Sequence, residues 1–187
     1  MVIIKRVTDT AELEGIQELQ RKNLKHLITT EEAATQGFVT AEYSKEFFEA
    51  MHMASPSIIA KQGDVVVGYA LVAVKSIRHH HDLLADLFNC IDKVTYNGIL
   101  LRNSPYVVVG QLCVAKEYRG QRLAQKMYNY FQECLSTEFD YLITDVARDN
   151  PRSLKAHVTT GFKIVDTLTY GGVSWDIVLW DWSSSKK

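Results

Sequence analysis

The chain has 187 residues, 47% of them hydrophobic and 23% charged, and its formal net charge is −1. A chain of this length can bury a full hydrophobic core, and its composition excludes a disordered chain, a collagen and a coiled-coil rod. The near-zero charge provides no basic field for nucleic acid or anionic lipid, so we expect neither a nucleic-acid nor a membrane partner.

The cysteines and the apolar runs predict the cellular setting. The three cysteines, Cys90, Cys113 and Cys134, are odd in number and widely spaced, which suggests neither a disulfide framework nor a CxxC metal site. The start of the chain, residues 1–6, is too short and too quickly charged for a signal peptide. The longest apolar run, residues 65–74, is too short to span a bilayer. We therefore expect a soluble, cytoplasmic protein.

The first part of the chain predicts strands around two helices. In order, we expect a strand (2–8), a helix capped by Asp9, a polar connector (29–39), a helix capped by Thr40, and two hairpin strands (57–61 and 65–76). Asp9 and Glu12 have the spacing of a capping box, and Leu24 and Leu27 extend the apolar face of the first helix. The strand over 65–76 is apolar on both faces, which predicts a central place in the sheet.

The second part alternates strands and helices. After a helical insertion at 78–101 we expect strands over 105–115, 140–147, 162–170 and 173–182, with helices over 119–137 and 151–160. This alternation implies a parallel pair within a mixed sheet of about seven strands flanked by helices, an α/β fold of the mixed α+β type. We expect one domain over residues 1–182 and a disordered tail over 183–187.

A candidate anion site follows the strand over 105–115. The turn after this strand carries Arg119, Gly120 and Arg122 and leads into an amphipathic helix. The start of a helix presents free backbone N–H groups and the positive end of its dipole, which suits a phosphate or pyrophosphate. The alternative is an ordinary turn with solvated arginines.

The same stretch resembles a known motif. Arg119-Gly120-Gln121-Arg122-Leu123-Ala124 is similar to the pyrophosphate loop of the GNAT superfamily of N-acetyltransferases, which reads Gln/Arg-x-x-Gly-x-Gly/Ala. Arg119 and Ala124 match the first and last positions, whereas Arg122 replaces a glycine that lets the backbone approach the phosphates without a Cβ. The resemblance implies that all six residues bind acetyl-CoA.

A second segment supports the resemblance. Residues 150–162 are similar to the Asn-x-x-Ala/Ser-x-x-x-Tyr-x-x-x-Gly-Phe segment of the same family. The resemblance implies that Asn150 and Ser153 contact the pantetheine arm, and that His157, in the tyrosine position, protonates the departing CoA thiolate. It also implies that the backbone of Leu112, Cys113 and Val114 binds the pantetheine, with one N–H polarising the thioester carbonyl.

The sequence does not identify the residue that deprotonates the amine. Gln111 stands where many relatives have a glutamate, and a glutamine cannot take a proton. Asp145, Glu117 and Glu18 are the candidates, and each is more easily explained as a solvated or structural carboxylate.

Several other side chains have both a functional and a structural interpretation. The thiol of Cys113 is more easily explained as a small buried group than as a nucleophile. His79, His80 and His81 are adjacent in the chain and have no second ligand cluster, so we expect no metal, although this run could line a substrate mouth. Candidates for touching the amine, or else for packing, are Tyr43, Phe47, Phe48, Tyr170, Trp175 and Asp176.

The predicted function is acetyl transfer from acetyl-CoA, as cosubstrate, to a primary amine by direct attack in a ternary complex. The first alternative is a non-catalytic acyl-CoA-binding module, favoured by the departures at Arg122 and Gln111. The second is an α/β protein in which Arg119 and Arg122 bind another phosphate or nothing. The acceptor is a small-molecule or peptide amine of open identity, and the resemblance suggests a monomer or a homodimer.

Overall fold

One mixed sheet organises the computed structural model, which describes residues 1–170 and 172–183, without the side chains of residues 34–36 and 170. Within these residues the sheet has seven strands in the order β1-β2-β3-β6-β7-β9-β8. The strands are β1 (Val2–Arg6), β2 (Ile58–Gln62), β3 (Val65–Ala73), β6 (Tyr106–Val114), β7 (Tyr141–Ala147), β8 (Lys163–Tyr170) and β9 (Val173–Asp181). The pair of β6 and β7 is parallel and the other pairs are antiparallel, which confirms the predicted fold class.

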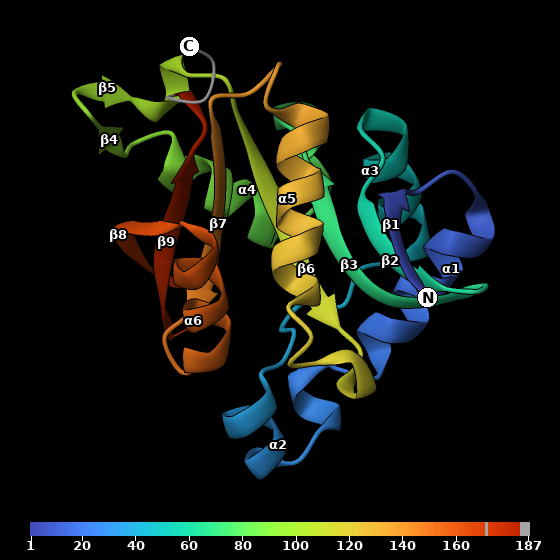
Figure 1. Cartoon of the computed structure of the whole chain (residues 1–187). Coiled ribbons are helices and arrows are strands. Elements are labelled where there is room, and N and C mark those ends of the chain that lie inside the picture. The colour runs from blue at the N-terminus through green and yellow to red at the C-terminus, as the bar shows by residue number, and fades with distance from the viewer. Residues whose placement is uncertain (171, 184–187) are drawn as a thin grey trace.

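Helices cover both faces of this sheet (Figure 1). They are α1 (Thr10–Arg21), α2 (Thr30–Gln36), α3 (Lys45–Ala54), α4 (Asp82–Ile91), α5 (Leu123–Leu135) and α6 (Pro151–Thr160). Short 3-10 helices are η1 (Lys25–Leu27), η2 (Lys75–His80), η3 (Leu101–Asn103) and η4 (Lys116–Tyr118). Because side chains alternate along each strand, one core forms against α1, α3 and α4 and the other against α5.

The two central strands separate near their middle. β6 and β7 pair from Tyr106 with Tyr141 to Val108 with Ile143, and no further pairing of the two is seen in the described part of the chain. The hydroxyl of Thr144 donates to the carbonyl of Val109 at 2.8 Å and closes the paired region. Opposite β3, the register of β6 shifts, so that β6 carries one extra residue at Gly110–Gln111. Beyond this point β6 diverges from β7, so the edge of β6 that would pair with β7 is open at Leu112–Val114.

Two predictions for the first part of the chain are wrong, a connector and a helix start. The predicted polar connector contains α2, whose first turn is capped because the Thr29 side chain accepts from the N–H of Glu32. The second predicted helix, α3, begins after Ser44 and not after Thr40, since Ser44 caps the N–H of Phe47. α1 is capped by Asp9 as predicted.

The first helix is shorter than its apolar stripe. α1 ends at Arg21. Leu24 is still buried beyond the helix, whereas Leu27 is 62% exposed. Of the two apolar residues predicted to extend the helix, Leu24 is buried as part of a loop and Leu27 is not buried.

Helix α5 begins four residues later than predicted. Gly120 has φ 80° and Arg122 has φ 57°, both in the left-handed region, so residues 119–122 form a loop and not a first helical turn. α5 begins at Leu123, directly after this loop.

The segment predicted as an insertion packs into the core. It contains α4 and a small hairpin of β4 (Thr95–Tyr96) and β5 (Ile99–Leu100), turning at Asn97-Gly98 as expected. An ion pair joins Arg78 to Asp92 at 2.9 Å, and the Tyr106 hydroxyl donates to the same carboxylate at 2.7 Å. These contacts tie the segment to β6.

Of the predicted tail, residues 184–187 lie outside the described residues. In the residues that are described, no helix is long and apolar enough to cross a membrane.

Candidate functional site

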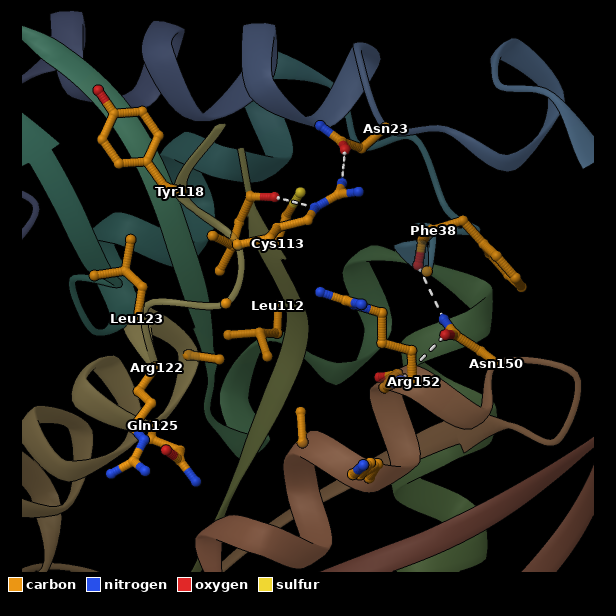
Figure 2. A pocket seen from close by; sticks show the side chains of 18 of the residues that line it. Asn23, Phe38, Leu112, Cys113, Tyr118, Arg122, Leu123, Gln125, Asn150 and Arg152 are labelled. Atoms are coloured by element: carbon orange, nitrogen blue, oxygen red, sulfur yellow. Dashed lines mark hydrogen bonds between the residues drawn. The ribbon is translucent and has the colours of Figure 1, made fainter. Parts of the chain in front are cut away.

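A pocket of about 430 Å³ lies between the start of α5, the start of α6 and the end of β6 (Figure 2). Every residue predicted to bind acetyl-CoA lines it except Gln121, and these residues are Leu112, Cys113, Val114, Arg119, Gly120, Arg122, Leu123, Ala124, Asn150 and Ser153. Gln121 is exposed, and its side-chain amide donates to the carbonyl of Glu117 at 3.3 Å. We call this pocket the donor pocket.

The start of α5 gives the donor pocket its anion-binding character. Arg122 holds the N-cap position, and its side chain makes no capping hydrogen bond to the first turn. The N–H groups of that turn have no intrahelical partner by construction and lie beside the pocket lining of Leu123, Ala124 and Gln125. The left-handed φ of Arg122 costs roughly 1–2 kcal/mol in a residue with a Cβ, which is a cost that glycine avoids.

Four basic residues line the donor pocket, namely Arg119, Arg122, Arg152 and Lys155. Figure 2 shows Arg152 extending from α6 across the pocket toward β6, while the guanidinium of Arg122 lies beside Gln125. Arg152 and Lys155 were not among the predicted binding residues. Both lie within the second motif, after Asn150. The motif accepts any residue at these two positions, so it did not identify them as binding residues.

Arg119 is tied into the protein on two sides. Its Nε donates to the carbonyl of Val114 at 3.0 Å, and its Nη2 donates to the side-chain oxygen of Asn23 at 2.5 Å. Its Nη1 is buried and has no partner in the described residues. Arg119 therefore fixes the loop against α1 and β6, and it also brings positive charge to the pocket.

Asn150 joins the two sides of the donor pocket. Its side-chain oxygen accepts from the N–H of Ser153 at 3.2 Å and caps α6, and its Nδ2 donates to the carbonyl of Phe38 at 3.3 Å. Asn150 is 6% exposed. It thus positions the start of α6 against residues 37–39, a wall that the sequence did not predict.

A smaller pocket of about 80 Å³ continues from the first. Phe38, Val39, Leu112, Asn150 and Ser153 line both. The small pocket opens where β6 and β7 separate, and its further lining includes Tyr43, Leu83, Gln111, Asp145, His157 and Trp175. We call it the acceptor pocket.

Asp145 ranks first among the three carboxylates proposed as a base. It lines the acceptor pocket, and burial raises its pKa to about 6. A hydrogen bond from its own backbone N–H offsets part of this rise. Glu117 and Glu18 are exposed and outside both pockets' described linings. A carboxylate with a pKa near neutrality suits proton abstraction at physiological pH.

His157 lines the acceptor pocket, but its hydrogen bonds do not fit the predicted acid role. Its Nδ1 lies 2.7 Å from the carbonyl of Ser153, which can only accept, so this nitrogen carries the proton. Its Nε2 lies 2.6 Å from the Tyr128 hydroxyl and therefore accepts from it. Burial lowers the pKa of His157 to about 4, so the ring is neutral at pH 7 and has no N–H directed at a thiolate.

The remaining candidates have structural partners. The Gln111 side chain accepts from Tyr69 and Gln20 at 2.6 and 2.9 Å and donates to the carbonyl of Ala41 at 2.9 Å. Burial raises the pKa of the Cys113 thiol to about 12, which makes it a poor nucleophile.

The hairpin and histidine candidates divide between the pocket lining and structural contacts elsewhere. Trp175 lines the acceptor pocket, whereas Asp176 pairs with Arg148 at 2.7 Å. The Tyr170 side chain lies outside the described residues. The ring of His81 packs against Tyr43 at 4.9 Å, and the described residues contain no group of three or more potential metal ligands.

Comparison with known proteins agrees with this geometry. A family model described as the acetyltransferase (GNAT) family matches residues 22–162, and no curated protein sequence matches the chain. The fold is similar to that of the ribosomal-protein-S18-alanine N-acetyltransferase from Escherichia coli, with a TM-score of 0.65 at 12% identity, over 98% of this chain and 95% of that chain.

Two further solved structures are similar. Arabidopsis thaliana NAA60, in complex with acetyl-CoA, has a TM-score of 0.65 at 15% identity, over 97% of this chain and 99% of that chain. An N-acetyltransferase from Staphylococcus aureus Mu50 has a TM-score of 0.64 at 16% identity, over 97% of this chain and 99% of that chain. At these identities the likeness identifies the fold.

Proposed function

Because the chain belongs to the acetyltransferase (GNAT) family, we propose that it transfers the acetyl group of acetyl-CoA to the primary amine of a small molecule or peptide. One observation carries the proposal. The donor pocket, lined by the start of α5, is continuous along β6 with an acceptor pocket that holds a carboxylate of raised pKa. We propose that residues 1–182 form a single domain for this reaction, as a monomer or a homodimer.

The residues of the donor pocket fit the parts of acetyl-CoA. The N–H groups at the start of α5 and the cations of Arg152 and Lys155 suit a pyrophosphate. The edge of β6 at Leu112–Val114 suits the amide groups of a pantetheine arm, because it lies beyond the last residue that pairs with β7. Acetyl-CoA supplies an activated acetyl group as a thioester.

Asp145 takes the first proton in the proposed reaction. An acceptor ammonium entering the acceptor pocket gives one proton to the Asp145 carboxylate and becomes a nucleophilic amine. The amine nitrogen forms a bond to the thioester carbon, the carbon–sulfur bond breaks, and a backbone N–H of β6 stabilises the oxyanion. The second proton of the attacking nitrogen neutralises the thiolate, so the step balances without a proton from His157. Asp145 then releases its proton to solvent.

We propose that His157 has a packing role. Its neutral ring packs against Tyr128 and Phe162, with ring centroids 5.4 and 5.1 Å away, and the three rings join α5, α6 and the residue before β8. This role replaces the acid role that the motif implied.

The test is release of free thiol from acetyl-CoA in the presence of a panel of amines, with the acetylated amine identified by mass spectrometry. We expect amine-dependent release. Binding of acetyl-CoA with no release from any amine would contradict the proposal and favour the non-catalytic acyl-CoA-binding module.

A further inference from the structure

Helix α4 of the predicted insertion reaches the acceptor pocket through one side chain. Among the described residues of α4, Leu83 alone lines this pocket. It lies in the first turn of the helix and is partly exposed. Leu83 lies outside both motifs on which the resemblance to the family rests, so its contribution to the pocket comes from the fold of this chain.

Leu83 lies on the same side of the sheet as the carboxylate. Alternation along β7 places Asp145 on the face of Tyr141 and Ile143, which belong to the core packed against α4. Tyr43 belongs to the same core and also lines the acceptor pocket. The acceptor side of the pocket is therefore bounded by Asp145, Tyr43 and Leu83. Helix α4 lies on the opposite face of the sheet from α5 (Figure 1).

The turn that carries Leu83 is held firmly in place. The next residue, Leu84, is 2% exposed, and Leu87 and Phe88 are buried one turn later. His81, just before the helix, packs against Tyr43 at 4.9 Å and Phe47 at 5.6 Å. A side chain on such a support acts as a rigid wall, because moving it requires repacking of the core.

The chemistry of the acceptor pocket fits a narrow cationic group. Of its described lining residues, Asp145 is the one that carries a full charge at neutral pH, and the pocket holds about 80 Å³. The aromatic rings of Tyr43 and Trp175 provide further favourable surface for an ammonium group. The pocket thus accommodates an amino group on a slender arm and excludes bulk beside the nitrogen.

We propose that Leu83 is the specificity-determining residue for the acceptor, because it limits the bulk next to the reacting nitrogen. The inference rests on the proposed function. It deepens that function by assigning the acceptor class, a primary amine on an unbranched carbon, to a side chain of the insertion.

Binding of CoA conjugates tests this inference without requiring turnover. The probes carry –CH2–CO–NH–R on the CoA sulfur, with R either methyl or cyclohexyl, and their affinities are measured by calorimetry. For the wild-type chain we expect the cyclohexyl conjugate to bind about tenfold more weakly than the methyl conjugate. In Leu83→Ala this difference disappears, while the affinity for CoA itself is unchanged. In Leu83→Phe, the methyl conjugate also loses affinity.

Ile99→Ala is the matched control, since Ile99 lies in the same insertion, is 47% exposed and is outside the described pocket linings. Ile99→Ala should keep the wild-type difference in affinity between the methyl and cyclohexyl conjugates. Equal size dependence in wild type and Leu83→Ala, with CoA bound normally, would overturn this inference and leave the proposed function intact. Failure of the wild-type chain to bind CoA and every conjugate would overturn both.

Discussion

Single residues determine the chemistry of this site through their surroundings. Asp145 and His157 both line the acceptor pocket, and burial disfavours the charged form of each. The effect raises the pKa of Asp145 to about 6, which suits the proposed base, and leaves His157 neutral. Sequence motifs identified the position of His157 but not its partners, because the Tyr128 hydroxyl comes from a helix that is distant in the chain.

Turnover should depend on the ionisation of Asp145. The base must be deprotonated, so kcat/KM for the amine falls as the pH drops through about 6. Asp145→Asn should lower kcat/KM by about 10²–10⁴ and leave the Kd for acetyl-CoA near the wild-type value. Initial rates from pH 5 to 8 for both proteins, with acetyl-CoA titrations alongside, check this. Wild-type rates in Asp145→Asn would exclude Asp145 as the base.

The pair of His157 and Tyr128 should contribute to stability and not to proton transfer. Tyr128→Phe and His157→Phe should each lower the free energy of unfolding by about 1–3 kcal/mol. Each substitution removes one partner of the buried hydrogen bond and leaves the other partner unsatisfied. The double variant should lose less free energy of unfolding than the two single variants lose together, because it leaves no unsatisfied partner. Urea unfolding measures these values.

Rates measured on the same His157 and Tyr128 variants separate the two roles. We expect kcat to stay within a few-fold of wild type in His157→Phe. A large loss of kcat in a stably folded His157→Phe, with acetyl-CoA affinity kept, would restore the acid role that the motif implied.

At the scale of elements, the local sequence predicted most boundaries where a cap or a hydrophobic period is strong. The helix over 151–160 agrees with α6, since Asn150 caps it and Pro151 opens it. The predicted start of α5 was wrong because Arg122 adopts a left-handed φ of 57°. An arginine in the sequence does not indicate this backbone conformation. Helix α2 was missed because seven residues with few apolar positions give no periodic signal.

A buried carboxylate joins β1, α1 and β2. Glu12 of α1 accepts from Lys5 of β1 at 2.6 Å and from Lys61 of β2 at 3.0 Å. Burial alone would raise its pKa, but the bonds from Lys5, the N–H of Thr8 and Lys61 outweigh it and lower the pKa from 4.5 to about 2. The charged form is therefore favoured in the folded state.

This ion pair cluster should make stability depend on pH. The stabilisation is fully present above pH 4.5, the ordinary pKa, and is lost as the pH falls toward 2. Glu12→Gln should lower the free energy of unfolding by about 2–4 kcal/mol at pH 7, because two lysines lose their partner, and by less at pH 3. Urea unfolding at both pH values measures this difference.

Glu14→Gln is the control for Glu12→Gln. Glu14 lies on the same helix, and its pair with Lys45 at 3.2 Å is exposed. We expect a change below about 0.5 kcal/mol. A pH-independent loss in Glu12→Gln, or an equal loss in Glu14→Gln, would contradict the account of the cluster.

At the scale of the whole molecule, the order of strands and helices predicted the mixed sheet, and two motifs predicted one wall of each pocket. The other walls come from residues 37–39 and from Leu83, which no motif marks and which only the folded chain brings to the site. The separation of β6 and β7 joins the two pockets. The central claim is that the donor pocket binds acetyl-CoA through the start of α5.

Thermal unfolding with and without acetyl-CoA tests that claim most directly, comparing wild type with Ala124→Glu and Ala11→Glu. Both substitutions place a carboxylate at the second position of a helix, which suits the helix dipole, but only Ala124 lines the donor pocket. At a hundred times the Kd, acetyl-CoA should add about 2.7 kcal/mol and raise Tm by roughly 5–10 °C in wild type and in Ala11→Glu. The shift should vanish in Ala124→Glu. An unchanged Tm in wild type, or an equal shift in all three proteins, would contradict the account.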